Sequence, residues 1–568
     1  IARRQRQMCI RDSTITPMGG RLLKYFLSHP LKQIDLLLKR QDAIQEIINH
    51  ANSTPTLCLY LKKICDLERI IMRIQTQQCM PKDFIALRTS LTIIPEITKQ
   101  LCGYTTSLMQ EIRDNLVDIS RLTHLLYQSL VEDPPMRIGD KPLFNKGYHS
   151  DLDTLYDLVS GDKNFITEYR DRLQRELGIK TLRISYNKIF GYYIEVSRNS
   201  AHKIPKEFVR KQTLANTERF ISPILKEYED KIFSAEEKIM ELEQYLYGMI
   251  KASVSSESSK ILQIAKAIAH LDVWMSFAHL ASTSNFCRPV FYDGSEFTLV
   301  QSKHPVLMSI LPSHTFIPND VKLDCNENRL FIITGPNMAG KSTYIRQIAL
   351  IAILAQTGSF IPATSAQIGI IDQVFSRIGA SDDLTRGYST FMVEMMETAH
   401  ILHNVTKNSL VILDEIGRGT STYDGVAIAW ATSEFLLNSI GCKTLFATHY
   451  YELTELEELF SGVRNYCMAI EEQGDDITFL RKVISGGTDK SYGIYVAKIA
   501  GLPSSVITHA KLILDKLLSS KKSDIEPVQM PMQIQKIHPI LQQLQAIDPN
   551  TLTPIQSLQL LLQWKNEL

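Results

Sequence analysis

The sequence of 568 residues lacks the features of a secreted, zinc-stabilised or membrane-spanning protein. It has nine cysteines, an odd number, and no two of them form a C-x-x-C pair. Scattered cysteines of this kind are typical of reduced core residues, and their spacing disfavours a structural zinc site. The longest apolar run, Ala349 to Ala355, is far shorter than the ~20 residues that a bilayer requires, and the chain does not start like a signal peptide. We therefore expect a soluble intracellular protein with no membrane partner.

The sequence also lacks an excess of charge of one sign. Its formal net charge is +1, with 44% hydrophobic and 22% charged residues, which is ordinary for globular protein. No global field indicates a nucleic acid as partner, so any contact with DNA must come from a local patch. The length favours roughly three to four domains.

Periodicity divides the chain into segments of different character. Residues 1–13 resemble a translated sequencing adapter, the alternative being a genuine basic arm, and we exclude them from the fold argument. From Thr14 to Gly178, Leu and Ile at spacings of three and four predict amphipathic helices. Residues 179–215 predict a small β insertion into this helical scaffold, with helical spacing resuming at about Leu214. Helices are expected again over 216–285, and the charged part, 226–246, predicts a long helix with its own ion pairs.

The second half alternates strands with helices. Residues 286–518 therefore predict an α/β domain with a mainly parallel sheet. Residues 519–568 predict a linker and a helical tail. The expected fold class is multidomain: a mainly α-helical part with a small β-rich insertion, followed by an α/β domain.

A phosphate-binding loop is predicted by residues 330–343, LFIITGPNMAGKST. A buried strand, Leu330 to Thr334, precedes a G-x-x-x-x-G-K-S loop that opens a helix. Glycines let backbone N–H groups converge on phosphate oxygens, and the helix N-terminus adds the positive end of its dipole. In this pattern Lys341 binds the β- and γ-phosphates and the Ser342 hydroxyl ligates Mg²⁺. The residues expected to bind ATP are Gly335, Pro336, Asn337, Met338, Ala339, Gly340, Lys341, Ser342 and Thr343.

Two further strands are expected to end beside this loop. The run 410–415, LVILDE, places Asp414 at a strand end, where it can help hold Mg²⁺, and makes Glu415 the candidate general base. The alternative for Glu415 alone is a surface carboxylate. The run Lys443 to Ala447 ends at His449, for which we favour a γ-phosphate sensor over a structural role.

Four motifs together resemble the MutS family of mismatch repair ATPases: GPNMAGKST (335–343), DDLTRGYSTFMVEM (382–395), LDEIGRGTSTYDG (413–425) and FATHYYEL (446–453). The segments 14–23 and 29–44 resemble the family's helical core, and 179–196 and 211–227 resemble its clamp domain and returning helix. The resemblance covers nearly the whole chain from Thr14. It implies a mainly α-helical core and lever over 14–178, a β-rich clamp insertion over 179–215, a lever helix returning to the core over 216–285, and an α/β P-loop ATPase domain of the ABC type over 286–518. Members of this kind bind double-stranded DNA as a homodimeric clamp. The resemblance also implies a MutL-type repair partner, and a location in the cytoplasm and on the nucleoid if the chain is bacterial.

The resemblance also implies roles for single residues. Asn337 joins the catalytic group with Glu415 and His449. Ser389 belongs to a signature segment, caps a helix that starts near Phe391, and acts on the nucleotide of the partner subunit. Phe316 falls where members stack an aromatic ring on adenine, although on its own it would be assigned to the core.

A basic island marks the expected clamp. Nine Lys/Arg and three Glu lie between residues 179 and 219, a balance of 9 − 3 = +6. Such an island suits contact with the phosphate backbone, the alternative being a merely solvated face. The residues that we expect to bind DNA are Lys188, Lys206, Arg210 and Lys211.

The segment 491–517 has two amphipathic helices around Gly501 and Pro503, which suggests a DNA-reading helix-turn-helix. In the family the matching segment joins two ATPase domains, and we expect dimerisation here.

The resemblance begins inside the core, whereas members carry a mismatch-reading domain and a connector domain before it. We therefore expect a fragment or a naturally shortened protein, and assign no mismatch-reading aromatic. The alternative within the family is a paralogue that acts on recombination intermediates. A transporter-type ATPase is disfavoured by the GYST signature and the clamp insertion, and a non-hydrolysing organiser by the presence of Lys341 and Glu415.

Overall fold

The structure is a computed structural model that describes residues 13–187, 191–312, 315–379, 389–473, 476–487, 492–520 and 564. The chain divides into two units, Ile1–Tyr492 and Gly493–Leu568. Among the described residues, no helix has the length and apolarity needed to cross a membrane.

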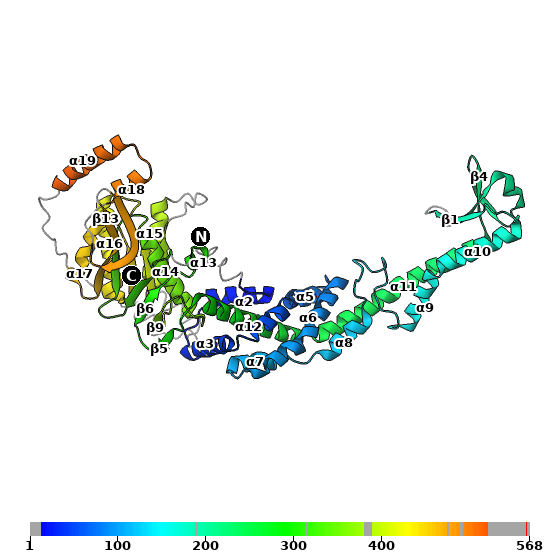
Figure 1. Ribbon diagram of the computed structural model, residues 1–568, viewed down its shortest axis with the longest axis horizontal. Coiled ribbons are helices and arrows are strands. Elements are labelled where there is room, and N and C mark those ends of the chain that lie inside the picture. Colours follow the sequence, from blue (N-terminus) through cyan, green and yellow to red (C-terminus); the bar gives the residue numbers. More distant parts are fainter. Residues whose placement is uncertain are drawn as a thin grey trace. The chain divides into compact units, whose positions relative to one another are not determined.

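The first part of the larger unit is helical, as predicted for residues 14–178. Its helices are α2 (Pro17–Ser28), α3 (Ile34–Asn49), α4 (Thr54–Leu61), α5 (Leu67–Gln75), α6 (Pro81–Gln100), α7 (Ser107–Asn115), α8 (Ser120–Ser129), α9 (Ser150–Ser160) and α10 (Asp162–Leu177). Two long helices, α11 (Pro223–Ser256) and α12 (Ser258–Ser284), complete this part. The α12 helix packs against α2, α3 and α7 around one hydrophobic core (Figure 1).

The start of α2 is fixed by a buried carboxylate on α12. Asp272 accepts hydrogen bonds from the backbone N–H groups of Ile15 (2.9 Å) and Thr16 (2.7 Å) and from the Thr16 hydroxyl (2.7 Å). The Thr16 side chain also caps α2 by accepting from the Gly19 N–H. A Cβ at Gly19 would lie 2.1 Å from Asp272 Oδ2, so this close approach of the two helices requires glycine.

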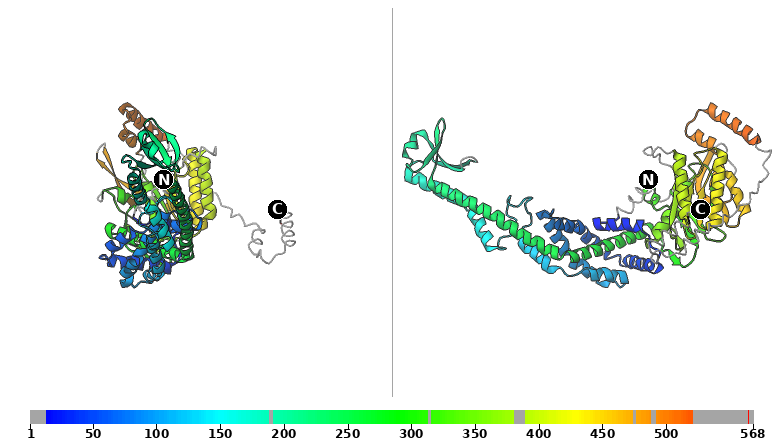
Figure 2. Two further views of the ribbon diagram at one scale, coloured as in Figure 1. Left: turned by 90° about the vertical axis from the view of Figure 1, so that its right-hand side faces the viewer. Right: turned by 180° about the vertical axis from the view of Figure 1, so that it is seen from behind.

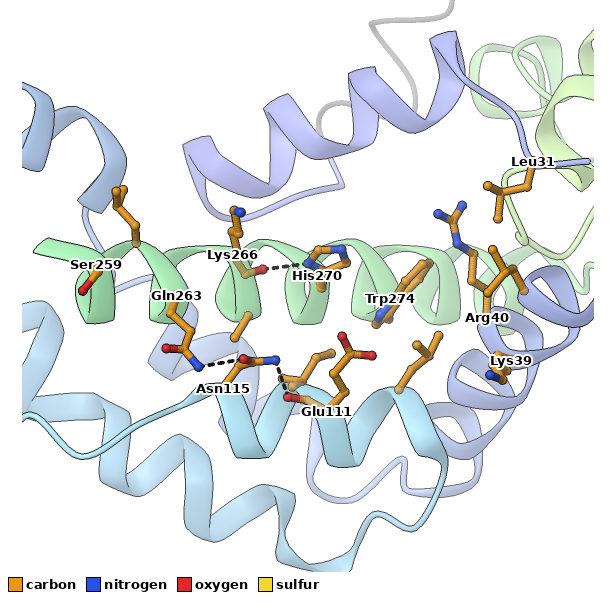
Figure 3. Close-up of a pocket in the computed structure, with 15 residues that line it drawn as sticks. Leu31, Lys39, Arg40, Glu111, Asn115, Ser259, Gln263, Lys266, His270 and Trp274 are labelled. Carbon is orange, nitrogen blue, oxygen red and sulfur yellow. Dashed lines mark hydrogen bonds between the residues drawn. The ribbon is translucent and has the colours of Figure 1, made fainter. Parts of the chain in front are cut away.

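A pocket of about 610 Å³ opens between α3, α7 and α12 (Figure 3). Gln263 Nε2 donates to Asn115 Oδ1 across it at 2.8 Å. On α12, His270 Nδ1 lies 2.8 Å from the Lys266 carbonyl oxygen, and burial lowers the pKa of His270. The partners of these side chains thus come from the helical core itself, a side chain for Gln263 and a backbone carbonyl for His270.

The β insertion is a four-stranded antiparallel sheet of order β1-β2-β4-β3. Its strands are β1 (Arg183–Asn187), β2 (Gly191–Ser197), β3 (Val209–Thr213) and β4 (Thr217–Ile221). The strands expected around Leu182 to Val196 are confirmed, but the expectation of helical spacing from Leu214 is wrong. The segment from Thr217 to Ile221 pairs with β2 instead and places Phe220 opposite Ile194, so the boundary predicted at 215 falls before the last strand.

The helix that follows this sheet carries the ion pairs expected of an exposed helix. It starts at Pro223, where Ser222 accepts a hydrogen bond from the Leu225 N–H at 3.1 Å. Lys226 lies 3.1 Å from Asp230, and Lys231 lies 2.8 Å from Glu227. Both pairs join residues four apart, which face each other on a helix. Seen from behind, α11 is continuous from the sheet to the helical core (Figure 2).

The α/β part contains a six-stranded sheet of order β10-β11-β12-β8-β13-β14. Its strands are β8 (Leu330–Thr334), β10 (Val374–Ile378), β11 (Leu410–Asp414), β12 (Lys443–Ala447), β13 (Val463–Gln473) and β14 (Asp476–Ser485). All neighbours pair in parallel except β13 and β14, so the predicted mainly parallel sheet is confirmed.

Both faces of this sheet are buried, because residues along a strand point alternately to its two sides. On β8, Phe331 and Ile333 pack in the core that includes α14 (Lys341–Ala355), whereas Leu330 and Ile332 pack in the core on the other side. That second core includes α15 (Thr390–Asn404) and α16 (Thr422–Glu434).

A second sheet was not anticipated from the sequence. It has the order β5-β9-β6-β7 and is formed by β5 (Val290–Tyr292), β6 (Phe297–Ser302), β7 (Asn319–Leu323) and β9 (Ser365–Gly369). It shares a hydrophobic core with α14. Short helices α13 (Leu307–Ile310) and α17 (Leu456–Leu459) lie in connections of the α/β part.

The C-terminal end of α14 is hydrogen-bonded to the helical core. The Leu31 N–H donates to the Gln356 carbonyl oxygen at 2.7 Å, and Gln356 Nε2 donates to the Leu31 carbonyl oxygen at 2.8 Å. Arg40 Nη1 donates to the Thr357 carbonyl oxygen at 2.7 Å. One backbone–backbone and two side chain–backbone hydrogen bonds therefore join the α/β part to the helices.

The smaller unit contains the two helices predicted in 491–517. These are α18 (Gly493–Ile499) and α19 (Ser504–Ser520), with Gly501 at φ 89° between them. Because α19 continues to Ser520, the linker expected from Ser519 begins inside a helix. The rest of the linker and helical tail predicted at 519–568 lies outside the described residues apart from Trp564.

Candidate functional site

The carboxyl ends of β8, β11 and β12 lie side by side. These strands are neighbours and parallel, and the register pairs Asp414 with Ala447 and Ala447 with Ile333. The Glu415 N–H donates to the Ala447 carbonyl oxygen at 2.8 Å, and the Thr448 N–H donates to that of Ile333 at 3.0 Å. The three strand ends expected to meet are therefore held together by backbone hydrogen bonds.

The loop between β8 and α14 has the open backbone expected of a phosphate cradle. Gly335 (φ 130°), Met338 (φ 70°) and Gly340 (φ 108°) all have positive φ, and Gly340 is the N-cap of α14. A Cβ at Gly335 would lie 3.2 Å from Met468 Cβ, so the loop passes close to β13. In the loop, Ala339 is buried whereas Asn337 and Met338 are exposed.

Lys341 is 3% exposed and lies under the loop that precedes it. Its Nζ donates to the carbonyl oxygens of Gly335 (2.5 Å) and Pro336 (3.2 Å). Burial lowers the pKa of Lys341 to about 8, an effect that the nearby Glu415 carboxylate partly opposes. The ammonium is thus desolvated and held by backbone oxygens alone at hydrogen-bond distance.

Ser342 and Asp414 meet as the sequence predicted. Ser342 Oγ donates to Asp414 Oδ1 at 2.9 Å, and Asp414 Oδ2 lies 3.3 Å from Arg346 Nη2. Arg346 was not identified from the sequence. It follows Ser342 by one turn of α14, and this spacing of four is the signal that could have revealed it.

Glu415 is the centre of a charged cluster. Its φ of 59° is unusual for a residue with a side chain and turns the carboxylate away from the strand direction. Its Oε2 lies 2.5 Å from Arg418 Nη1, its Oε1 contacts His449 Nε2, and Lys341 Nζ lies 4.0 Å away. Burial opposes ionisation of this carboxyl, but His449, Arg418 and Lys341 together lower its pKa below the usual value.

Two predicted site residues lie elsewhere among the described residues. Ser389 is the N-cap of α15 and accepts from the Met392 N–H at 3.2 Å, which confirms the predicted cap. Phe316 is half-buried in the segment before β7. No hydrogen bond or ion pair within the described part of the chain joins either residue to the phosphate loop. The rest of the signature segment, 380–388, lies outside the described residues.

The basic residues of the four-stranded sheet differ in their surroundings. Lys206 and Lys211 are exposed, whereas Arg210 lies 3.4 Å from Glu218 and Arg219 lies 2.9 Å from Glu195. Lys211 is the extra residue where the register between β3 and β4 shifts. Lys188 lies outside the described residues.

Sequence models of MutS domains match most of the chain. MutS domain III matches residues 9–278, MutS domain V matches 331–518, and the DNA mismatch repair protein MutS C-terminal region matches 535–566. The phosphate loop and the three strand ends therefore lie in the domain V match, and the four-stranded sheet lies in the domain III match.

Curated relatives agree with these matches. The DNA mismatch repair protein MutS of Protochlamydia amoebophila is 47% identical over 530 residues, which are 93% of this chain and 62% of that protein. That of Lachnoclostridium phytofermentans is 46% identical over 89% of this chain and 55% of its own length. That of Caldicellulosiruptor bescii is 41% identical over 100% of this chain and 67% of its own length. The chain thus spans between about half and two thirds of the length of these relatives, and it belongs to the MutS family.

Proposed function

We propose that this chain binds ATP with Mg²⁺ at the loop between β8 and α14 and hydrolyses it. One observation carries the proposal: Ser342 Oγ lies 2.9 Å from Asp414 Oδ1, beside a Lys341 ammonium 4.0 Å from Glu415. A hydroxyl, two carboxylates and a buried cation thus converge at the N-terminus of a helix, as phosphoryl transfer requires.

The donor set fits Mg²⁺, which prefers oxygen ligands and binds through one or two carboxylates together with phosphates. Ser342 would ligate it directly and Asp414 would hold it, at the point where the two side chains now hydrogen-bond to each other. When bound, Mg²⁺ neutralises charge on the transferred phosphoryl group. Lys341 exchanges its bonds to two carbonyl oxygens for phosphate oxygens.

Glu415 is assigned as the general base. Its pKa is lowered, so the carboxylate is ionised at neutral pH and accepts a proton from the attacking water. Arg418 and His449 orient it from two sides, and His449 also serves as the γ-phosphate sensor. Asn337, exposed in the loop, is assigned to orient phosphate or water.

The remaining assignments follow the family. Ser389 acts on the nucleotide of the partner subunit in a homodimer, Phe316 stacks on adenine, and α18 and α19 contribute to dimerisation. The four-stranded sheet is the DNA clamp and extends to Ile221, the helices form the core and lever, and residues 286–518 form the ABC-type ATPase domain. Double-stranded DNA and a MutL-type protein are the proposed partners in mismatch repair.

The test is ATP turnover by the purified chain with and without Mg²⁺, and with and without duplex DNA. We expect Mg²⁺-dependent hydrolysis whose rate changes on DNA binding. The Lys341→Ala variant, which loses the phosphate contact, is the control for contaminating ATPases. Turnover that is equal in this variant, or absent from folded unaltered chain, would contradict the proposal.

A further inference from the structure

Two residues after the proposed base, the backbone of Gly417 is held at both its N–H and its carbonyl oxygen. Its N–H donates to Glu394 Oε1 at 2.6 Å, and its carbonyl oxygen accepts from the Tyr450 hydroxyl at 2.8 Å. Glu394 belongs to α15, whereas Tyr450 directly follows His449, the residue in contact with Glu415. Gly417 therefore connects α15 to the segment that carries the proposed γ-phosphate sensor.

The close packing around Gly417 restricts the position of its backbone. Gly417 has a φ of 92°, and a Cβ on it would lie 2.7 Å from the Gly425 Cα. A Cβ on Gly425 would in turn lie 2.2 Å from the Tyr450 hydroxyl. The loop after Glu415 and the start of α16 are thus packed backbone against backbone, and the Tyr450 side chain, from the segment after β12, packs against both, so a displacement of Gly417 is expected to displace its neighbours.

Glu394 is itself fixed by a buried cation. Its side chain is 6% exposed, and Arg377 Nη2, on a side chain that is 4% exposed, lies 3.4 Å from Glu394 Oε2. One carboxylate oxygen therefore faces Arg377 on β10 and the other faces Gly417. Arg377 also lies 3.3 Å from Glu397, which is 54% exposed and on the next turn of α15.

A buried charge pair is a costly way to hold a helix against a sheet, because both ions lose their hydration. An apolar pair would pack α15 equally well but could not accept from the Gly417 N–H. The carboxylate of Glu394 thus joins three separate segments: β10, α15 and the loop after Glu415.

From this geometry we infer that Glu394 is a positioning residue, which couples the placement of α15 to the orientation of the Glu415 carboxylate. This inference rests on the proposed ATPase function. Ser389 caps the N-terminus of α15, five residues before Glu394. A shift of α15 on contact of its N-terminal end with a partner subunit would therefore change, through Glu394 and Gly417, the orientation of the Glu415 carboxylate.

The test compares Glu394→Gln with Glu397→Gln in the full chain. Both variants remove one carboxylate from Arg377, but only Glu394 contacts Gly417. Because small misplacements of a catalytic group cost up to about 10²-fold, we expect Glu394→Gln to lower kcat by about 10- to 100-fold. The affinity of Glu394→Gln for a non-hydrolysable ATP analogue stays within about twofold of that of the unaltered chain. The control Glu397→Gln keeps a near-normal kcat. Tyr450→Phe, which removes the other contact with Gly417, lowers kcat by a smaller factor in the same direction.

A double-variant measurement separates positioning from a purely structural role. Ser389→Ala removes the proposed direct action on the partner's nucleotide and also the contact that α15 transmits to the Glu415 carboxylate. Because the transmitted part also requires Glu394, the effects of Ser389→Ala and Glu394→Gln on kcat are less than multiplicative. Equal kcat in Glu394→Gln and Glu397→Gln overturns the inference, as does strict multiplicativity. If Glu394→Gln proves unfolded by its thermal transition, Tyr450→Phe decides, and an unchanged kcat in that variant overturns it. No hydrolysis by the unaltered chain contradicts the proposed function itself, whereas hydrolysis that is insensitive to Glu394 contradicts the coupling alone.

Discussion

The phosphate loop and the basic island of residues 179–219 hold their charges in opposite ways. In the loop, Lys341 is buried, and Ser342 and Asp414 bond to each other. In the island, Lys206, in the turn before β3, and Lys211, on β3, are exposed, and two arginines are paired with glutamates. A desolvated charge is fixed in one geometry, whereas an exposed charge is screened and mobile. Changes in the loop should therefore act through geometry, and changes on the sheet through the number of charges.

The largest effect is expected at Glu415. The Glu415→Gln variant keeps the size of the side chain but cannot accept the proton of the attacking water, so ATP still binds while turnover falls by roughly 10²–10⁴-fold. Single-turnover hydrolysis and binding of a fluorescent ATP analogue measure the two quantities. Normal turnover in this variant would assign the base to another residue.

Lys341 gives the loop a pH dependence that the sheet should lack. Its pKa is about 8 in the nucleotide-free protein, and bound phosphates favour the charged form and raise it. Affinity is therefore insensitive to this group below pH 8. Above pH 8 the lysine must take up a proton on binding, and affinity falls by up to about tenfold per pH unit.

Titrations of the ATP analogue between pH 7 and 9.5 measure this slope. Lys341→Arg is the matched control, because a guanidinium remains protonated throughout that range. The same slope in Lys341→Arg would show that another group causes it.

Ser389 tests whether geometric effects on turnover are confined to the phosphate loop, because this residue lies outside the loop. Ser389→Ala should leave nucleotide binding intact and lower turnover by about tenfold, since the residue is proposed to act across the dimer on a transition-state charge. Mixing this variant with Lys341→Ala protein should change turnover per active site once subunits exchange. Strictly additive activities, with exchange verified by labelled subunits, would exclude a shared site.

The smallest effect on nucleotide chemistry is expected on the sheet. Reversing Lys206 and Lys211 to Glu should flatten the dependence of log K for duplex DNA on log salt, by up to about two units at ~0.9 per phosphate contact. Nucleotide affinity should not change. Reversing Lys99 and Lys260, which lie on helices of the core, changes the total charge equally and is the control. Equal flattening by both pairs would mean that total charge, and not the sheet, governs binding.

The proposed phosphate site was predictable because each of its motifs follows a short buried run, which marks a strand. Buried runs before the glycines, before Asp414 and before His449 predicted three strands, and parallel pairing placed their ends together. The Ser389 cap was predictable because capping depends only on the following turn. Glu394 and Arg377 were not identified, because their pairing joins two separate elements, α15 and β10, and no fixed sequence spacing links the two residues.

The sheets were predicted less well than the helices. The last strand of the four-stranded sheet, β4, was interpreted as helix because Phe220 and Ile221 suit either structure in so short a run. The β5-β9-β6-β7 sheet was missed because its strands have three to six residues and are brought together from distant segments. Counting Lys and Arg in the sequence also overstated the number of unpaired positive charges in the proposed clamp. Arg210 is paired with Glu218, and this pairing depends on the hairpin register.

The hydrogen bonds at the C-terminal end of α14 make this helix a rigid connection between the phosphate loop and Leu31. It has 15 residues and is therefore about 22 Å long. One end carries Lys341 and Ser342, and at the other Gln356 is bonded in both directions to the backbone of Leu31. A helix bends more readily than it shortens, so an axial shift of the loop reaches the backbone of Leu31 almost undiminished. The connection uses the backbone of Leu31 and both the backbone and the side chain of Gln356, so substitutions of exposed side chains along α14 should leave it unaltered.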